Sequence, residues 1–122
     1  MIMNAKWNRA FEKMAAKGSK LEVTGVMAIA KKEADGKISM QLQEYGKEFD
    51  DWGNFYSIAC AKIMEMVRTG EDSGTKTPLA GEFENFDGGI LSDDYYVTFS
   101  GAEGHIDLEI AKVGLNVLLS KE

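Results

Sequence analysis

The sequence predicts an α+β fold in which three amphipathic helices cover both faces of a central antiparallel sheet. Three observations support this: apolar residues recur at helical spacing in three stretches, strand-like segments lie between these stretches, and an Asp-Gly pair joins two of the segments. Consecutive antiparallel strands with helices on either side suit a three-layer arrangement. At 122 residues the chain has room for one domain, 1–122, and it contains neither an internal repeat nor a linker.

The helices are expected near the start, in the middle and at the end of the chain. The first should end at Lys17-Gly18, because glycine is common at helix C-termini. In the second, Asp51 can cap the start and Gly70 ends the helix. The third should run from about His105 to Ser120. The apolar stripes of the three helices contain Trp7, Phe11 and Met14; Phe55, Ala59, Ile63 and Met66; and Ile106, Ile110, Val113 and Val117.

The two segments Leu21–Lys31 and Ile38–Tyr45 are expected to form a hairpin. Between them lies Asp35-Gly36, which is typical of a type I′ turn, because both central residues of that turn need positive φ. The centre of the first strand, Val26–Ala30, is apolar at every position, as expected of a central strand with helices on both faces. The second strand alternates apolar and polar residues, which predicts one buried and one solvated face.

Further strands are expected after the second helix. A polar loop, Gly70–Pro78, leads into Leu79–Phe86, and Tyr95–Ser100 also has strand character. Gly88–Leu91 is expected to form a short strand between them, with a turn at Ser92–Asp94. The sheet would then have four or five strands.

Composition excludes several classes of function. The net charge is −6, with an isoelectric point near 4.8, and the basic residues are dispersed, which argues against nucleic-acid binding. The longest apolar run, Val26–Ala30, is too short to span a bilayer. Cys60 is the only cysteine, so an internal disulfide, a structural zinc site and a Cys-x-x-Cys redox pair are excluded. No signal peptide is recognisable at the N-terminus, and we expect a cytoplasmic protein without a membrane partner.

The junction Ser100–Asp107 is the main candidate for a ligand site. It contains Gly101, Gly104 and His105, the only histidine of the chain, and it leads from a predicted strand into the third helix. Backbone N–H groups at a helix start, approached closely through glycines, can bind a carboxylate, a phosphate or a haem propionate. The alternative is structural: the glycines turn the chain, and Asp107 stabilises the helix dipole.

Other groups of reactive residues favour structural interpretations. Glu103, His105 and Asp107 are oxygen and nitrogen ligands close in sequence, but side chains on the first turn of a helix diverge, which disfavours a metal site. The acidic clusters fall at predicted turns and helix caps, so we assign no catalytic residue to them. Cys60 lies between two alanines in a predicted helix and is interpreted as a packing residue.

Gly114 stands in the interior of the third helix, where glycine is unfavourable by about 1 kcal/mol relative to alanine. Its presence predicts that something approaches the helix backbone closely. The two alternatives are the sheet and another subunit.

A set of short motifs extends over most of the chain and is densest from Gly88 to Leu115. The motifs are Gly88-Gly89, Ser100-Gly101-Ala102, Asp107, Ala111 and Gly114-Leu115, with the Asp35-Gly36 hairpin and Ala59-x-x-Lys62 also in order. Together they resemble the haem-degrading family, also called GlcG/HbpS-like.

The resemblance implies a profilin-like fold, with a five-stranded antiparallel sheet between helices, and a homo-oligomer. It also implies a ligand corner, whose residues here would be Gly88, Gly89, Ser100, Gly101, Gly104 and His105. Because the family includes haem-binding proteins, haem is the cofactor to test. His105 would be its iron ligand, since imidazole is a common donor to haem iron.

Two functions lead as hypotheses, and an enzyme, whose reactive side chains would have to converge in space, is a third. The first is a small-ligand-binding protein of the GlcG/HbpS-like type, which binds haem or another small anion and has no assigned reaction. The second is a homo-oligomeric assembly module of roadblock or profilin type, which pairs through a helix face or a sheet edge and needs no small ligand. Both share this element order, so the order alone does not choose between them.

Overall fold

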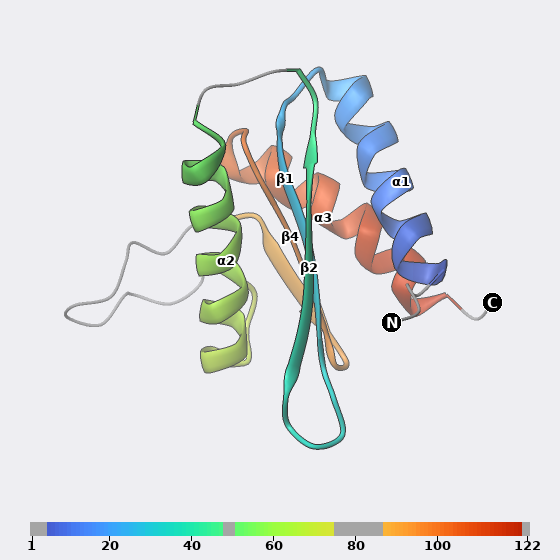
Figure 1. Cartoon of the computed structure of the whole chain (residues 1–122), viewed down its shortest axis with the longest axis vertical. Coiled ribbons are helices and arrows are strands. Elements are labelled where there is room, and N and C mark those ends of the chain that lie inside the picture. Colours follow the sequence, from blue (N-terminus) through green and yellow to red (C-terminus); the bar gives the residue numbers. More distant parts are fainter. Residues whose placement is uncertain (1–4, 48–50, 75–86, 121–122) are drawn as a thin grey trace.

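The computed structural model describes residues 5–47, 51–74 and 87–120. These residues form three helices and four strands, which confirms the α+β class (Figure 1). In chain order the elements are α1 (Ala5–Leu21), β1 (Gly25–Lys32), β2 (Ile38–Tyr45), α2 (Trp52–Thr69), β3 (Gly89–Ser92), β4 (Tyr95–Ser100) and α3 (Gly104–Leu119).

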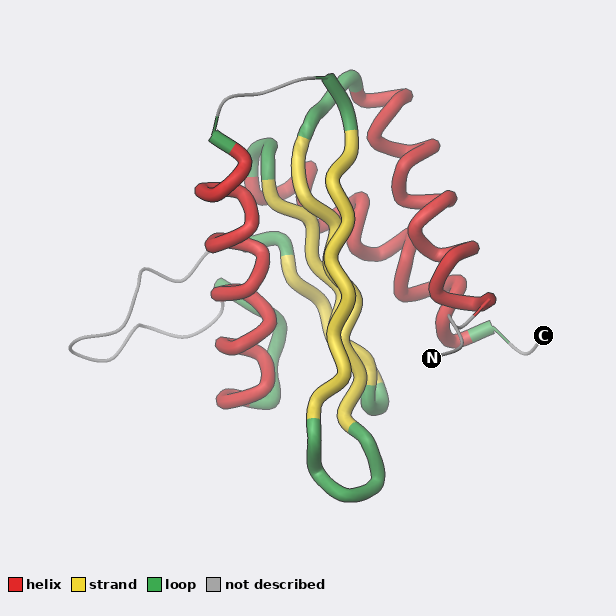
Figure 2. The backbone as a smooth tube through the Cα atoms, viewed as in Figure 1, coloured by secondary structure: helices red, strands yellow, loops and turns green. Residues whose placement is uncertain are grey.

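The four strands form one antiparallel sheet in the order β2-β1-β4-β3. Helix α2 lies on one face of this sheet, and α1 and α3 lie on the other, so the expected three layers are present (Figure 2). The resemblance implies five strands, and the described residues form four. The strand predicted over Leu79–Phe86 lies outside the described residues.

The sheet separates two apolar cores. One lies between the sheet and the α1–α3 layer, and the other lies between the sheet and α2. Strand β1 contributes to both, because Met27 and Ile29 face the first core while Val26, Ala28 and Ala30 face the second. All five are fully buried, as predicted for a central strand.

The hairpin between β1 and β2 forms as predicted, but its turn differs from type I′. Gly36 has a φ of 88°, whereas neither Ala34 nor Asp35 has a positive φ. The Gly36 N–H donates to the carbonyl of Glu33 (2.9 Å), and the Glu33 N–H donates to the carbonyl of Lys37 (2.8 Å). A turn followed by a left-handed glycine is the usual form of a three-residue hairpin loop.

The predicted end of the first helix at Lys17-Gly18 is wrong. Helix α1 continues to Leu21, and Glu22 takes the left-handed conformation, with a φ of 56°. The Val23 N–H donates to the carbonyl of Gly18 (3.1 Å), which closes the helix in a Schellman motif. Gly18 has a packing role instead: a Cβ atom there would lie 3.0 Å from the ring of Tyr45 in β2.

Gly114 lies in the core rather than on a surface that another subunit could reach. A Cβ atom at this position would lie 2.5 Å from Sδ of Met14 in α1 and 3.2 Å from Cγ1 of Val97 in β4. The close approach predicted from the sequence is therefore made by α1 and the sheet. The buried stripe of α3 is accordingly rotated from the predicted one and consists of Asp107, Ile110, Ala111, Gly114, Leu115 and Leu118.

The second helix ends as predicted. Gly70 has a φ of 72°, and its N–H donates to the carbonyl of Met66 (2.9 Å). Asp51 occupies the N-cap position of α2, but its side chain makes no capping hydrogen bond. No helix among the described residues is long and apolar enough to cross a membrane.

Candidate functional site

A buried ion pair joins α2 to α3 at one end of the sheet. The Nζ atom of Lys62 lies 2.9 Å from Oδ2 of Asp107, and the side chains are 1% and 6% exposed. Lys62 also donates to the carbonyl of Phe99, at 2.6 Å, near the end of β4. The pair therefore connects both helices to the end of β4.

The chain after β4 is shaped around the carboxylate of Asp107. Strand β4 ends at Ser100, and the Ala102 N–H donates to Oδ1 of Asp107 (2.9 Å). The Asp107 N–H in turn donates to the carbonyl of Glu103 (2.9 Å), where α3 begins. The two carboxylate oxygens thus have different partners: one accepts from Lys62 and the other from the backbone.

Burial shifts the pKa of both members of the pair toward the neutral forms. It lowers the pKa of Lys62, against the opposing charge of Asp107 and, more weakly, of Asp87. It raises the pKa of Asp107, against the opposing charge of Lys62 and the backbone hydrogen bonds from Ala102 and Gly101. Groups whose pKa is shifted by burial and by a specific charged partner are enriched at functional sites. Structural ion pairs show pKa shifts with the same causes.

Glycines allow the surrounding chain to approach this pair. A Cβ atom on Gly88 would lie 2.5 Å from Cβ of Asp107 and 2.6 Å from Nζ of Lys62. Gly88 also has a φ of 114°, which residues with a side chain rarely adopt. A Cβ atom on Gly104 would lie 2.7 Å from Cβ of Asp87. Both positions therefore need glycine for packing.

The structure places the six predicted site residues at one end of the sheet, but in three different environments. Ser100 is buried in β4, opposite Val26, and the Gly89 N–H donates to Oγ of the buried Ser73 at 2.8 Å. Gly88 and Gly101 border the ion pair. Gly104 and His105 begin α3 on the outer side.

His105 points away from the ion pair into solvent. Its side chain is 73% exposed, and Nδ1 lies 3.6 Å from Oε2 of Glu103. Asp107 is turned inward to Lys62, so these three residues do not converge. Within residues 5–47, 51–74 and 87–120, no three His, Cys, Asp or Glu side chains are grouped as a metal site.

The pairing of Lys62 with Asp107 was not predicted from the sequence, although a signal for it is present. Lys62 falls on the same stripe of α2 as Ala59, Ile63 and Met66, all of which are buried. A lysine in the middle of an apolar stripe needs a buried partner, because an isolated buried ammonium is strongly unfavourable. Asp107 falls on the buried stripe of α3 and supplies the complementary charge.

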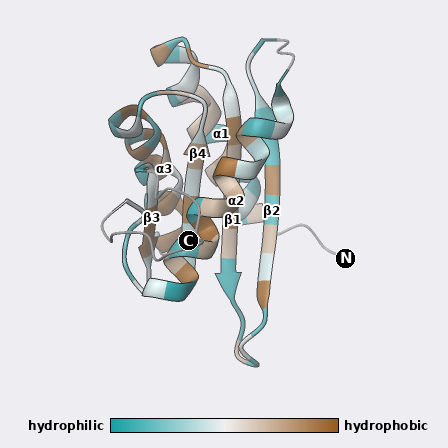
Figure 3. Cartoon of the chain, turned by 90° about the vertical axis from the view of Figure 1, so that its left-hand side faces the viewer, coloured by the Kyte–Doolittle hydropathy of each residue, from teal (hydrophilic) through white to brown (hydrophobic). Residues whose placement is uncertain are grey.

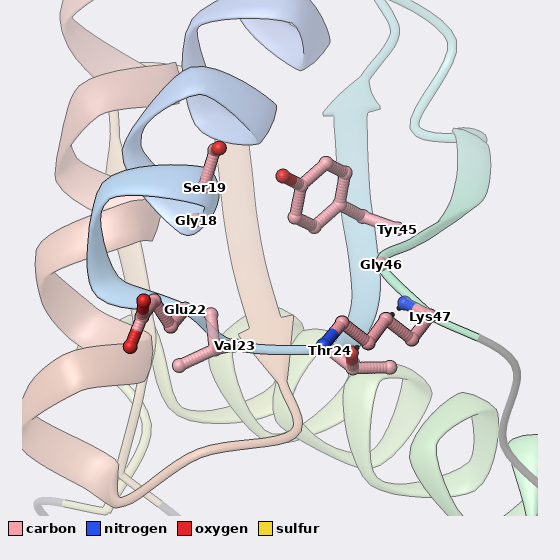
Figure 4. Close-up of a pocket in the computed structure, with 8 residues that line it drawn as sticks. All are labelled: Gly18, Ser19, Glu22, Val23, Thr24, Tyr45, Gly46 and Lys47. Atoms are coloured by element: carbon pink, nitrogen blue, oxygen red, sulfur yellow. Dashed lines mark hydrogen bonds between the residues drawn. The ribbon is translucent and has the colours of Figure 1, made fainter.

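A second feature at the same end of the sheet is a hollow of about 660 Å³ between α1 and β2. Its lining residues are Gly18, Ser19, Glu22, Val23, Thr24, Tyr45, Gly46 and Lys47. Figure 4 shows the ring of Tyr45 facing Gly18 and Ser19. The Lys47 N–H donates to Oγ1 of Thr24 (3.1 Å), which holds the two strand ends together. None of the six predicted site residues lines this hollow.

Comparisons of the chain with protein-family models, with curated proteins and with solved structures found no match. The resemblance to the GlcG/HbpS-like family therefore rests on the sequence motifs. Their arrangement in space adds one observation, since several of them meet at the Lys62–Asp107 pair.

Proposed function

We propose that the chain is a small-ligand-binding protein of the GlcG/HbpS-like type, with its ligand site on the outer side of the corner formed by Gly88, Gly101 and the start of α3. The observation that carries this proposal is the convergence of motif residues from four segments. Lys62 comes from α2, Gly88 precedes β3, Ala102 follows β4 and Asp107 lies in α3, and they meet around one ion pair.

The cost of the ion pair supports a role beyond stability. Removing two charges from water is expensive, and apolar side chains of similar volume often stabilise a fold equally well. The side chains of Lys62 and Asp107 are 1% and 6% exposed, so this unfavourable desolvation free energy arises at the corner where Gly88, Gly101 and Gly104 lie. A functional requirement at the corner accounts for the pair better than packing does.

The start of α3 favours an anionic ligand. The Lys62 ammonium and the Ala102 N–H already bind the carboxylate of Asp107, so the support for an anionic ligand comes from the start of α3 instead. Asp87 lies against Gly104, so a second carboxylate of the chain is near the start of α3. Because the helix start favours negative charge, a small anion or a haem propionate would bind there in competition with Asp87.

Haem is the first ligand to test, with His105 as its iron ligand. The imidazole is 73% exposed and is therefore accessible to a ligand from solvent. With haem bound, the porphyrin would supply the Soret absorbance that reports on binding, and ligation of its iron by a side chain would shift this band. The contribution of the chain would be the imidazole of His105 and a propionate contact at the helix start.

The experiment is a haemin titration followed by Soret absorbance, with serum albumin as a nonspecific control. We expect a saturable band near one equivalent that is lost or shifted in His105→Ala. Glu103→Gln is the matched control, because Glu103 is equally exposed and lies 3.6 Å from His105 but carries no iron-ligating nitrogen. A spectrum unchanged by His105→Ala would remove His105 from this role, and an unsaturable response would remove haem.

A further inference from the structure

The hollow between α1 and β2 is separate from the Lys62–Asp107 corner and has the size of a ligand site. Its volume of about 660 Å³ falls within the roughly 300–1,000 Å³ of small-molecule sites. It lies at the end of β2, and Figure 3 shows this strand changing from hydrophobic at its beginning to hydrophilic toward its end. A ligand in the hollow would therefore meet a polar part of the sheet.

Two glycines keep the hollow open. Gly46 has a φ of 108°, and a Cβ atom at this position would run into the side chain of Thr24. Gly18 lies beside the ring of Tyr45, whose Cε2 atom would be 3.0 Å from a Cβ atom at that position. A side chain at either glycine would therefore displace a residue that lines the hollow.

Three of the lining side chains carry a hydroxyl group. Among the described residues, the hydroxyls of Ser19 and Tyr45 form no hydrogen bond within the chain. The Thr24 hydroxyl accepts from the Lys47 N–H (3.1 Å) and still has its own O–H to donate. Because a hydroxyl can both donate and accept, three of them around one volume match a ligand that itself carries several hydroxyl groups.

The two charged side chains of the lining do not form a single ion-binding point. Glu22 and Lys47 are both exposed, and their charges cancel. Figure 4 shows the Lys47 side chain extended along Thr24, while the Glu22 carboxylate lies at the opposite border and points away from Tyr45. Exposed charges are hydrated and screened by salt, so this pair favours neither an anion nor a cation. A neutral ligand suits the hollow better.

The ring of Tyr45 adds an apolar contact surface. The side chain is half-buried, and one edge of the ring lies against Gly18 while the residue lines the hollow. The face of an aromatic ring is negatively polarised and attracts C–H groups. A pyranose sugar has a face of C–H groups bordered by hydroxyls, so one sugar ring can contact the aromatic ring and the hydroxyls together.

We propose that the hollow binds a pyranose sugar, with its C–H face on Tyr45 and its hydroxyl groups bonded to Ser19, Thr24 and Lys47. The bound sugar would stay partly in solvent, because Ser19 and Lys47 are exposed. None of the six corner residues lines the hollow. The sugar site therefore does not depend on the haem or anion site at the corner.

The test is a backbone amide NMR titration with D-glucose, D-galactose and D-mannose in separate experiments. Glycerol is the control for hydroxyl groups without a pyranose ring. We expect at least one hexose to give saturable shifts at Gly18, Gly46 and Lys47, with a Kd of about 1–10 mM. Glycerol should give no saturable shift. Shifts that saturate with none of the three hexoses, or that centre on Gly88 and Gly101, would overturn the proposal.

Two variants test the contacts of the sugar. Ser19→Ala should weaken binding about two- to tenfold by removing one hydrogen bond, and its exposed position leaves the fold intact. Tyr45→Leu should weaken binding about fivefold by removing the ring. Tyr95→Leu is the matched control, because Tyr95 is also half-buried against the same core but lies outside the hollow.

Equal losses in Tyr45→Leu and Tyr95→Leu would overturn the contact with the ring, because a general loss of packing would then account for both. Binding unchanged in both Ser19→Ala and Tyr45→Leu would place the sugar outside the hollow. If Tyr45→Leu does not fold, Ser19→Ala alone decides between these outcomes.

Discussion

The ammonium of Lys62 in α2 lies 2.9 Å from the carboxylate of Asp107 in α3, and the two side chains are 1% and 6% exposed. Lys62 also donates a hydrogen bond to the carbonyl of Phe99, and the Ala102 N–H donates one to the carboxylate of Asp107. The pair thus connects the helix on one face of the sheet to a helix on the other, at the end of β4.

Removing one member of this pair should destabilise the fold strongly. Lys62→Met leaves the Asp107 carboxylate buried without its counter-charge, and losing one partner of a buried pair costs about 3–5 kcal/mol. The double variant Lys62→Met/Asp107→Leu removes both charges and should recover most of this loss. Chemical denaturation of the two single variants and the double variant measures the coupling. Additive losses in the double variant would contradict the pairing.

Gly114→Ala should destabilise the chain, although alanine is the better helix former. The added methyl group would lie 2.5 Å from Sδ of Met14, and overpacking of this kind costs about 1–3 kcal/mol. Gly53→Ala in the first turn of α2 is the control, because a Cβ atom there meets nothing within 4 Å. It should stabilise by up to about 1 kcal/mol. Thermal unfolding of both variants tests the difference in sign.

Asp87→Asn should strengthen anion binding at the corner. Asp87 packs on Gly104 at the start of α3, so its negative charge competes with an anionic ligand. We expect the affinity for haemin to rise about two- to fivefold, which corresponds to the 0.3–1 kcal/mol of a charge at a helix start. Asp35→Asn, in the exposed hairpin loop, makes the same change in net charge far from the corner. Equal effects of the two substitutions would mean that only net charge matters.

The thiol of Cys60 should react slowly at neutral pH. Burial raises its pKa above the ordinary value of 9.0, so the thiolate fraction is smaller in the folded chain than in the unfolded one. A folded-state pKa above the unfolded value contributes stability at low pH, and this contribution is lost as pH rises through the folded pKa. The rate of reaction with a thiol reagent, followed against pH, should give an inflection above 9.0 in the folded protein and a lower one in denaturant.

Much of the fold follows from local sequence patterns. The bounds of β2 and β4, the buried strand β1 and the glycine end of α2 match the predictions, since alternation, apolar runs and glycine caps depend on neighbouring residues. Gly18 misled the prediction of the end of α1, because the ring of Tyr45, 27 positions later, sets its role. Contacts between distant segments cannot be read from local propensity.

The candidate site, like the fold, could be predicted only in part from the sequence. The sequence indicated that the glycines and Asp107 matter, but it could not show that the carboxylate turns inward while His105 faces solvent. That difference depends on how α3 is rotated over the sheet, where Gly114 packs closely against Met14. The apolar stripe predicted for α3 was rotated for the same reason.

The most direct test of the ligand proposal is a backbone amide NMR titration with haemin or a small carboxylate. The account predicts saturable shifts concentrated at Gly88, Gly101 and the Gly104–His105 start of α3, which are reduced by His105→Ala for haemin. Shifts confined to the hollow at Gly18, Tyr45 and Lys47, or spread without saturation over the surface, would contradict a ligand site at the Lys62–Asp107 corner.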